Sequence, residues 1–239
     1  MRKEFTSTAC GLRALAAAVV AVVVGAGTVA IHADTAAERL AESAVILKEV
    51  MEAPDKGIPT DLLAKSRCVV IVPGLKKAGL VVGGKYGRGF IVCRTTDRTG
   101  WGAPAALRIE GGSFGFQIGA SETDVIMLLM DQRSVDGIMN SKFTLGGDAD
   151  VAAGPVGRSA TAQTDASMNA KILSYSRSRG VFAGVALTGA TLRQDLDENQ
   201  SMYGKQLSTK EIVSGGIKPP AAAAELLKLL TTYSQGAPR

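Results

Sequence analysis

The stretch Cys68-Val-Val-Ile-Val-Pro-Gly74 decides the fold class of this chain. β-Branched residues favour strands, and Pro-Gly marks a turn. Similar apolar runs of strand length recur at Gly79–Val82, Phe90–Cys93, Ala105–Ile109, Ser113–Ile118, Val125–Met130, Ile172–Tyr175 and Val181–Leu192. Glycine- and aspartate-rich turns separate them, so the sequence predicts a series of short strands.

Helical patterns flank these strands. They cover residues 34–53, 60–65, 134–140 and 221–233. Two of the helix starts have a capping box, Thr35 with Glu38 and Ser208 with Glu211, and Pro220 suits the first position of the closing helix. We therefore expect a single compact α+β domain, with a mostly antiparallel sheet or barrel-like core and flanking N- and C-terminal helices.

The composition excludes most familiar enzyme classes. Glycine accounts for 28 of 239 residues, against about 7% in an average protein. Histidine occurs once, at His32, inside the segment that we assign to targeting below. A domain without histidine builds no Ser-His-Asp triad and no histidine-ligated zinc. We expect no enzymatic activity, no cofactor and no metal site.

Residues 1–33 have the features of an export signal. A basic amino-terminal region precedes an uncharged run from Ala14 to Ile31. Cleavage after Ala33 is the preferred interpretation; cleavage after Ala30 and an uncleaved anchor are the alternatives. Each places residues 34–239 outside the cytoplasm, as a periplasmic or membrane-associated domain.

Two cysteines, Cys68 and Cys93, remain after the signal segment is removed. An even pair in an oxidising compartment is compatible with a disulfide. Both cysteines also lie in apolar runs, where buried free thiols are common. The sequence leaves both states open.

Two near-motifs fail at decisive positions. Residues 79–85 match G-x-x-x-x-G-K, but Tyr86 stands where a phosphate-binding loop needs Ser or Thr. Residues 195–199 resemble the start of a calcium loop, but Gln200 and Gln206 replace its glycine and its bidentate glutamate. We interpret the first as a strand and turn and the second as a solvated, helix-starting stretch.

Charge is distributed unevenly. From Lys65 to Arg108 there are nine basic residues and one acid, Asp97, an excess of eight positive charges. The lipid-binding candidates among them, close to two glycine turns, are Lys76, Lys77, Lys85 and Arg88. Such side chains donate charge-assisted hydrogen bonds to phosphate head groups. The alternative is that the strands distribute them over several faces.

The first helix is acidic: its five acids outnumber its two bases. A helix that lies on an anionic membrane carries a basic polar face. We therefore expect this helix to pack on the domain.

Seven blocks of sequence together resemble the SYLF family, described as a lipid-binding domain and, in yeast, as an actin-regulator domain. They are Ile58–Pro73, Gly83–Gly89 (GGKYGRG), Trp101–Pro104, Gly111–Gly119 (GGSFGFQIG), Gly154–Arg158, Tyr175–Gly184 (YSRSRGVFAG) and Asn199–Tyr203. The resemblance covers residues 40–233 and identifies residues 34–239 as a SYLF-like domain.

The resemblance implies a compact, non-enzymatic domain that associates with phospholipids. Eukaryotic members bind phosphoinositides with help from an amphipathic N-terminal helix, and yeast members also bind actin filaments. The export signal points instead to a bacterial envelope, where no actin partner is expected. We therefore expect an anionic phospholipid or another amphiphile at a membrane surface as ligand. A structural or protein-interaction module, with an envelope protein as partner, is the alternative, and no nucleic acid is expected.

Overall fold

The computed structural model describes residues 35–53, 57–79, 82–97, 99–114, 119–140, 142–156, 170–178, 181–184, 187–214 and 216–235. The expected export segment, residues 1–33, lies outside the described residues.

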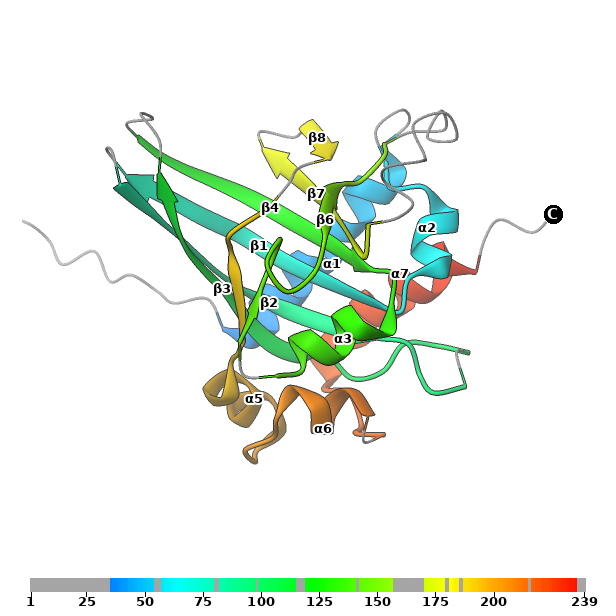
Figure 1. Ribbon diagram of the computed structural model, residues 1–239. Coiled ribbons are helices and arrows are strands. Elements are labelled where there is room, and N and C mark those ends of the chain that lie inside the picture. The colour runs from blue at the N-terminus through cyan, green and yellow to red at the C-terminus, as the bar shows by residue number, and fades with distance from the viewer. Residues whose placement is uncertain are drawn as a thin grey trace, which may run out of the picture. The chain divides into compact units, whose positions relative to one another are not determined.

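Nine strands of the described chain form one sheet (Figure 1). They are β1 (Cys68–Gly79), β2 (Val82–Cys93), β3 (Ala105–Phe114), β4 (Gly119–Leu129), β5 (Phe143–Thr144), β6 (Val151–Ala153), β7 (Ile172–Ser178), β8 (Val181–Gly184) and β9 (Thr191–Gln194). The order is β5-β9-β3-β2-β1-β4-β7-β6, with β8 paired to β7. Only β6 and β7 are parallel among these pairs, so the predicted mostly antiparallel α+β fold is confirmed.

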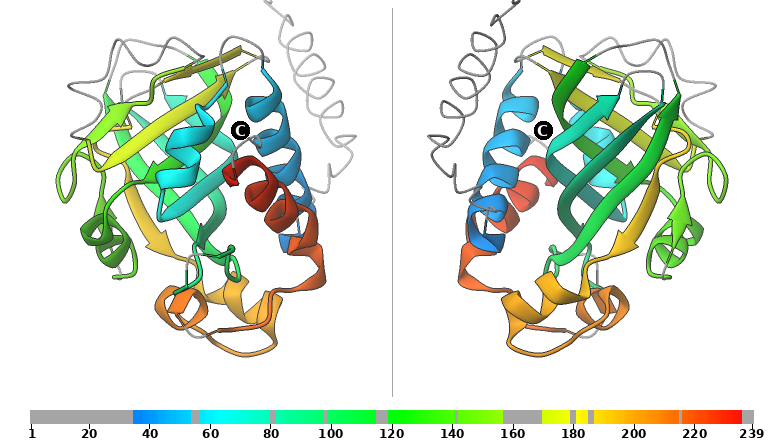
Figure 2. Two further views of the ribbon diagram at one scale, coloured as in Figure 1. Left: turned by 90° about the vertical axis from the view of Figure 1, so that its right-hand side faces the viewer. Right: turned by 90° about the vertical axis from the view of Figure 1, so that its left-hand side faces the viewer.

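The described helices lie on both sides of the curled sheet. They are α1 (Ala36–Glu52), α2 (Thr60–Lys65), α3 (Gln132–Ile138), α5 (Leu196–Tyr203), α6 (Thr209–Ser214) and α7 (Ala224–Ser234), the last preceded by a 3-10 turn (Ala221–Ala223). Figure 2 shows α1 and α7 side by side along one flank of the sheet. None of these helices is long and apolar enough to cross a membrane.

Alternate residues of the sheet enter two different cores. Val69 and Ile71 pack with α1, α2 and α7, on what we call the α1 face. Val70 and Val72 pack with residues of α3 and α6, on the α3 face. Because side chains of a strand alternate between faces, both faces of β1 are buried, which explains its continuous apolar run.

The four central strands are longer than predicted. Pro73-Gly74 does not end β1 but forms a bulge, at which the pairing register shifts against both β2 and β4. Gly74 has φ 55° there, and its N–H donates to Oδ1 of Asp124 at 2.9 Å. Similarly, Gly111-Gly112 lies inside β3 and residues 121–124 lie inside β4. A bulge absorbs one residue without reversing the chain, so these turn signals were misread.

The predicted strand Val181–Leu192 is instead two strands, β8 and β9. Gly189, with φ 80°, lies in the turn before β9. A positive φ is easily adopted by glycine and interrupts an extended strand.

Both capping boxes form as predicted. The N–H of Thr35 donates to the Glu38 carboxylate at 2.8 Å, and the N–H of Glu38 donates to Thr35 Oγ1 at 3.2 Å. Ser208 and Glu211 make the same exchange at 2.8 and 3.2 Å. The acidic helix α1 packs on the domain, with Leu40 and other apolar side chains buried, as expected.

Cys68 and Cys93 face each other in the β1–β2 register and form a disulfide. Directly opposed strand positions bring two Cβ atoms within reach of such a bond. The pairing, which the sequence left open, follows from this register.

Candidate functional site

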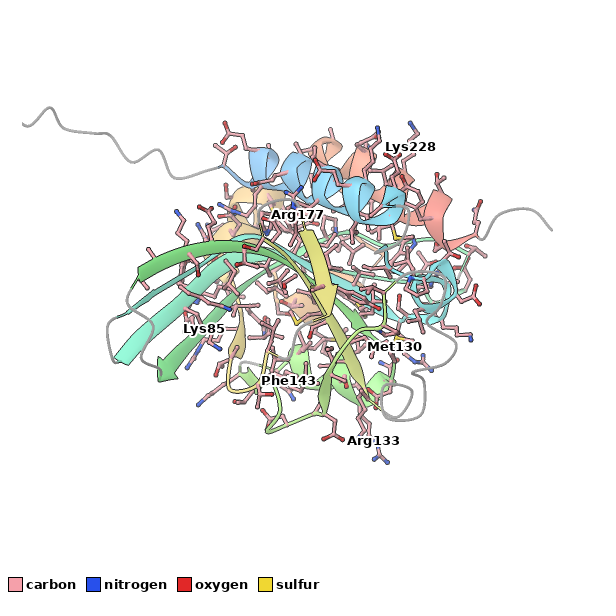
Figure 3. All side chains as sticks on the ribbon, turned by 90° about the horizontal axis from the view of Figure 1, so that it is seen from above. Lys85, Met130, Arg133, Phe143, Arg177 and Lys228 are labelled. Atoms are coloured by element: carbon pink, nitrogen blue, oxygen red, sulfur yellow. A yellow bond between two sulfur atoms is a disulfide. The ribbon has the colours of Figure 1, made fainter. Side chains whose placement is uncertain are left out.

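The four candidate cations divide between the two faces of the sheet. Lys77 of β1 lies directly opposite Lys85 of β2. A Cβ at Gly87 would contact Val72 and Leu75, both in the core of the α3 face, so Lys85, two residues away, lies on that face as well. Figure 3 shows Lys85 on the side of the strands opposite α1. Lys76 and Arg88 therefore lie on the α1 face.

Lys77 and Lys85 form the centre of a row across four strands. Ser121 of β4 lies beside Lys77, and Gly111 of β3 lies beside Lys85. The Lys85 stem packs over Gly111, with Cγ 3.3 Å from where a Cβ would stand. In the described part of the chain, neither lysine has a carboxylate within 4.0 Å. This Lys77–Lys85 pair is the candidate site.

The pair holds two like charges side by side without a neutralising partner in the described chain. Burial, and then the charge of Lys77, lower the pKa of Lys85 from its ordinary value. Opposed like charges destabilise a sheet by roughly 0.2–1 kcal/mol. Each ammonium carries three donors and no acceptor, so an oxyanion bound between the two would relieve the repulsion.

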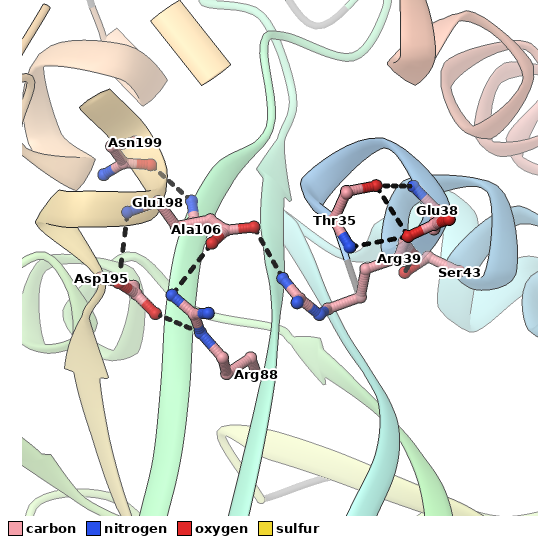
Figure 4. Close-up of polar contacts among 9 residues, drawn as sticks. All are labelled: Thr35, Glu38, Arg39, Ser43, Arg88, Ala106, Asp195, Glu198 and Asn199. Atoms are coloured by element: carbon pink, nitrogen blue, oxygen red, sulfur yellow. Dashed lines mark hydrogen bonds and ion pairs between the residues drawn. The ribbon is translucent and has the colours of Figure 1, made fainter. Parts of the chain in front are cut away.

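Arg88 is committed to ion pairs within the fold (Figure 4). Its Nε lies 2.8 Å from Oδ2 of Asp195, and its terminal NH2 lies 2.9 Å from Oε2 of Glu198. The hydrogen bond from Asp195 is the main reason that the pKa of Arg88 is raised. Glu198 also accepts from Arg39 of α1 at 2.7 Å. Arg88 therefore joins α1 and α5 to the sheet.

The stretch at 195–199 is buried, which corrects our prediction of a solvated helix start. Asp195, Glu198 and Asn199 are 2%, 9% and 0% exposed. Asp195 caps α5 by accepting from the Glu198 N–H at 3.3 Å. Asn199 accepts from the Ala106 N–H at 2.7 Å (Figure 4). The capping pattern is visible in the sequence, but the burial depends on partners about a hundred residues away.

Lys76 lies on the exposed part of the α1 face. Its neighbours in register are Tyr86 of β2 and Glu122 of β4. Tyr86 is 49% exposed, which is high for an aromatic residue. The adjacent carboxylate makes Lys76 a weaker anion site than the Lys77–Lys85 pair.

Other bases of the positive segment have partners. Arg94 lies 4.4 Å from the centre of the Trp101 ring and donates to carbonyl oxygens that follow α2 and lie within it. Arg108 and Arg193 share Glu110, at 2.6 and 3.2 Å. Most of the excess positive charge is thus used inside the fold, and the Lys77–Lys85 pair stands out.

The pair lies where the sheet projects beyond its flanking strands. β4 pairs with β7 only as far as Asp124, and β3 pairs with β9 only as far as Glu110. Beyond these residues the described strands β1 to β4 pair only with one another. We call residues 76–79, 82–86, 111–114 and 119–123 the extension; it projects from the body of the sheet in Figure 1.

Within the described residues, no group of three His, Cys, Asp or Glu side chains could hold a metal ion. The site therefore consists of amines, a hydroxyl and backbone groups. Such a set can bind an oxyanion, but it contains no paired acid and base for turnover.

Comparison with known proteins gives one family. A family model described as "Ysc84: Las17-binding protein actin regulator" matches residues 110–233. Over 179 residues the chain is 38% identical to LAS seventeen-binding protein 3 of Saccharomyces cerevisiae, covering 74% of this chain and 39% of that protein. Over 200 residues it is 34% identical to the human SH3 domain-containing YSC84-like protein 1, covering 81% and 58%. The chain thus spans about two fifths to three fifths of these relatives.

Proposed function

The chain belongs to the Ysc84 (SYLF) family, and from this premise we propose that it is a non-enzymatic module that binds anionic phospholipids at a membrane surface. The observation that carries the proposal is the Lys77–Lys85 pair, held opposed on the α3 face without a carboxylate partner in the described chain. The relatives are named as regulatory and binding proteins rather than as enzymes.

The chemistry of the pair favours a phosphate head group as ligand. Opposed residues of antiparallel strands have Cβ atoms about 5 Å apart, so both ammonium groups can reach the oxygens of one phosphate. A basic side chain near an anionic membrane surface contributes about 1 kcal/mol. The pair therefore supplies about 2 kcal/mol, an affinity gain of about thirtyfold.

The location belongs to the same proposal. Residues 1–33 have the sequence of an export signal, which places the domain at an envelope membrane, in the periplasm or otherwise outside the cytoplasm. Intact-mass measurement of protein recovered from the envelope reports whether the segment is removed.

Vesicle flotation tests the lipid ligand. The protein is mixed with phosphatidylcholine vesicles that contain or lack phosphatidylglycerol, at two salt concentrations. The variant Lys77→Gln/Lys85→Gln is compared with Lys205→Gln/Lys210→Gln, which removes the same charge from exposed positions near α6. We expect binding that requires phosphatidylglycerol, weakens with salt and falls about thirtyfold in the first variant only.

Two outcomes would contradict the proposal. Equal recovery with both kinds of vesicle would remove the electrostatic contribution. An equal loss in both variants would show that net charge, and not the opposed pair, controls binding.

A second candidate, a protein-interaction module, is favoured by the names of the relatives. The family description contains "Las17-binding", and the human relative is named as SH3 domain-containing. An envelope protein would then be the partner of this chain. Recovery of a stoichiometric partner from envelope extract by both wild type and Lys77→Gln/Lys85→Gln, without vesicle binding, would favour this function.

A further inference from the structure

The extension carries interfacial side chains at one level on both of its faces. Lys77 and Lys85 lie on the α3 face, and Lys76 and Tyr86 lie on the α1 face. The two rows are adjacent in register, so they are about 3.3 Å apart along the strands. Cations and a half-exposed tyrosine therefore surround the extension at the same height.

Beyond this level the extension carries no charge. The sequence from Ala78 to Gly84 and from Gly111 to Ala120 has no Asp, Glu, Lys or Arg. Small residues cover the described strands there, and Ala78, Gly84 and Gly112 are exposed. The last described pairs join Gly79 to Gly119 and Val82 to Phe114.

We propose that the extension docks end-on against an anionic lipid bilayer, with its uncharged end in the head-group region and the lysines of both faces at the phosphates. This inference rests on the lipid-binding function proposed above. The Gly79–Gly119 pair lies two residues, or about 7 Å, beyond Lys77. That length matches the roughly 5–10 Å by which interfacial elements enter a bilayer.

The distribution of charge opposes docking on one flat face. Docking by the α3 face would leave Lys76 directed away from the lipid, and docking by the α1 face would bring Glu110 and Glu122 toward anionic head groups. End-on docking brings Lys76, Lys77 and Lys85 to the surface together.

The strand edges limit the depth of entry. Residues 119–123 of β4 and 111–114 of β3 have strand partners on one side only among the described residues. Unpaired backbone groups are too costly to place in hydrocarbon, so the extension stops in the hydrated interface.

Tryptophan fluorescence with brominated lipids tests the orientation. In the full chain, Phe114→Trp marks the end of the extension, and Tyr86→Trp marks the level of the lysines if the first variant folds poorly. Val45→Trp is the control, because Val45 is 53% exposed on α1. The native Trp101 is 7% exposed and provides a constant background.

With phosphatidylglycerol vesicles, we expect a blue shift and bromine quenching at Phe114→Trp, weaker quenching at Tyr86→Trp and none at Val45→Trp. Flotation of the same samples reports binding independently. Binding without quenching at positions 114 and 86, or with quenching at position 45, would overturn end-on docking while leaving lipid binding in place. Absence of binding by the wild type would overturn both.

Discussion

Gly89 of β2 lies against the carbonyl oxygen of Ile71 in β1. A Cβ at Gly89 would overlap that oxygen and would stand 2.8 Å from Cα of Val72. The close approach occurs just before the bulge at Pro73-Gly74, after which Lys76 pairs with Tyr86 and Lys77 with Lys85. The absence of a side chain at Gly89 thus permits the strand geometry that builds the candidate site.

Gly89→Ala should lower the free energy of unfolding by about 1–3 kcal/mol, because overpacking against backbone cannot be relieved by a rotamer change. Gly84→Ala on the same strand is the matched control, since no atom lies within 4 Å of its added Cβ. Urea unfolding of both variants measures the difference. Similar stability of the two would show that β1 and β2 can separate at Gly89 at little cost.

The Cys68–Cys93 disulfide should contribute to stability. The two cysteines are 25 residues apart, and closing a loop of that length removes chain entropy worth about 3 kcal/mol from the unfolded state. We expect Cys68→Ala/Cys93→Ala to unfold at lower urea than the wild type. Reductant should lower the midpoint of the wild type and leave the variant unchanged; a wild type indifferent to reductant would argue against the bond.

Asp195 should make stability sensitive to acid. Burial disfavours its ionised form, but the hydrogen bond and charge of Arg88 outweigh burial, so its pKa is lowered. A carboxylate with a lowered folded-state pKa adds stability above its unfolded pKa, about 3.9. That stability is lost as the pH falls through the lower folded-state pKa.

We therefore expect Asp195→Asn to be less stable than the wild type at neutral pH and the difference to shrink below about pH 4. Urea unfolding from pH 7 to pH 3 measures this. Asp61→Asn, on the exposed surface of α2, is the control and should give a small difference at every pH. A constant deficit for Asp195→Asn would mean that charge is not the source of its contribution.

Lys77→Gln should raise the pKa of Lys85. Burial lowers the pKa of Lys85 and the charge of Lys77 lowers it further, so removing that charge restores part of the shift. An NMR titration of the Lys85 side chain measures the change, with Lys76→Gln, on the opposite face, as control. An unchanged or lower pKa in Lys77→Gln would show that the two ammonium groups do not interact.

Local patterns in the sequence were sufficient for the fold class and the helix starts. Both capping boxes join residues three apart, and the β-branched run at Val69–Val72 enters a strand wherever its partners lie. Strand ends were less predictable, because Pro73-Gly74 and Gly111-Gly112 have the composition of turns but lie inside β1 and β3. Whether such a dipeptide reverses the chain or forms a bulge depends on the neighbouring strands.

The sequence by itself determined that this chain has a strand-rich α+β domain, a cluster of cations near its middle and membership of a known family. Only the tertiary structure decided which cations act together. Arg88 is neutralised by Asp195, which is 107 residues away, and Lys77 is placed beside Lys85 by the register after the bulge. Charge depends on residue type, which the sequence states directly, whereas pairing depends on distances between strands and helices that only the folded chain sets.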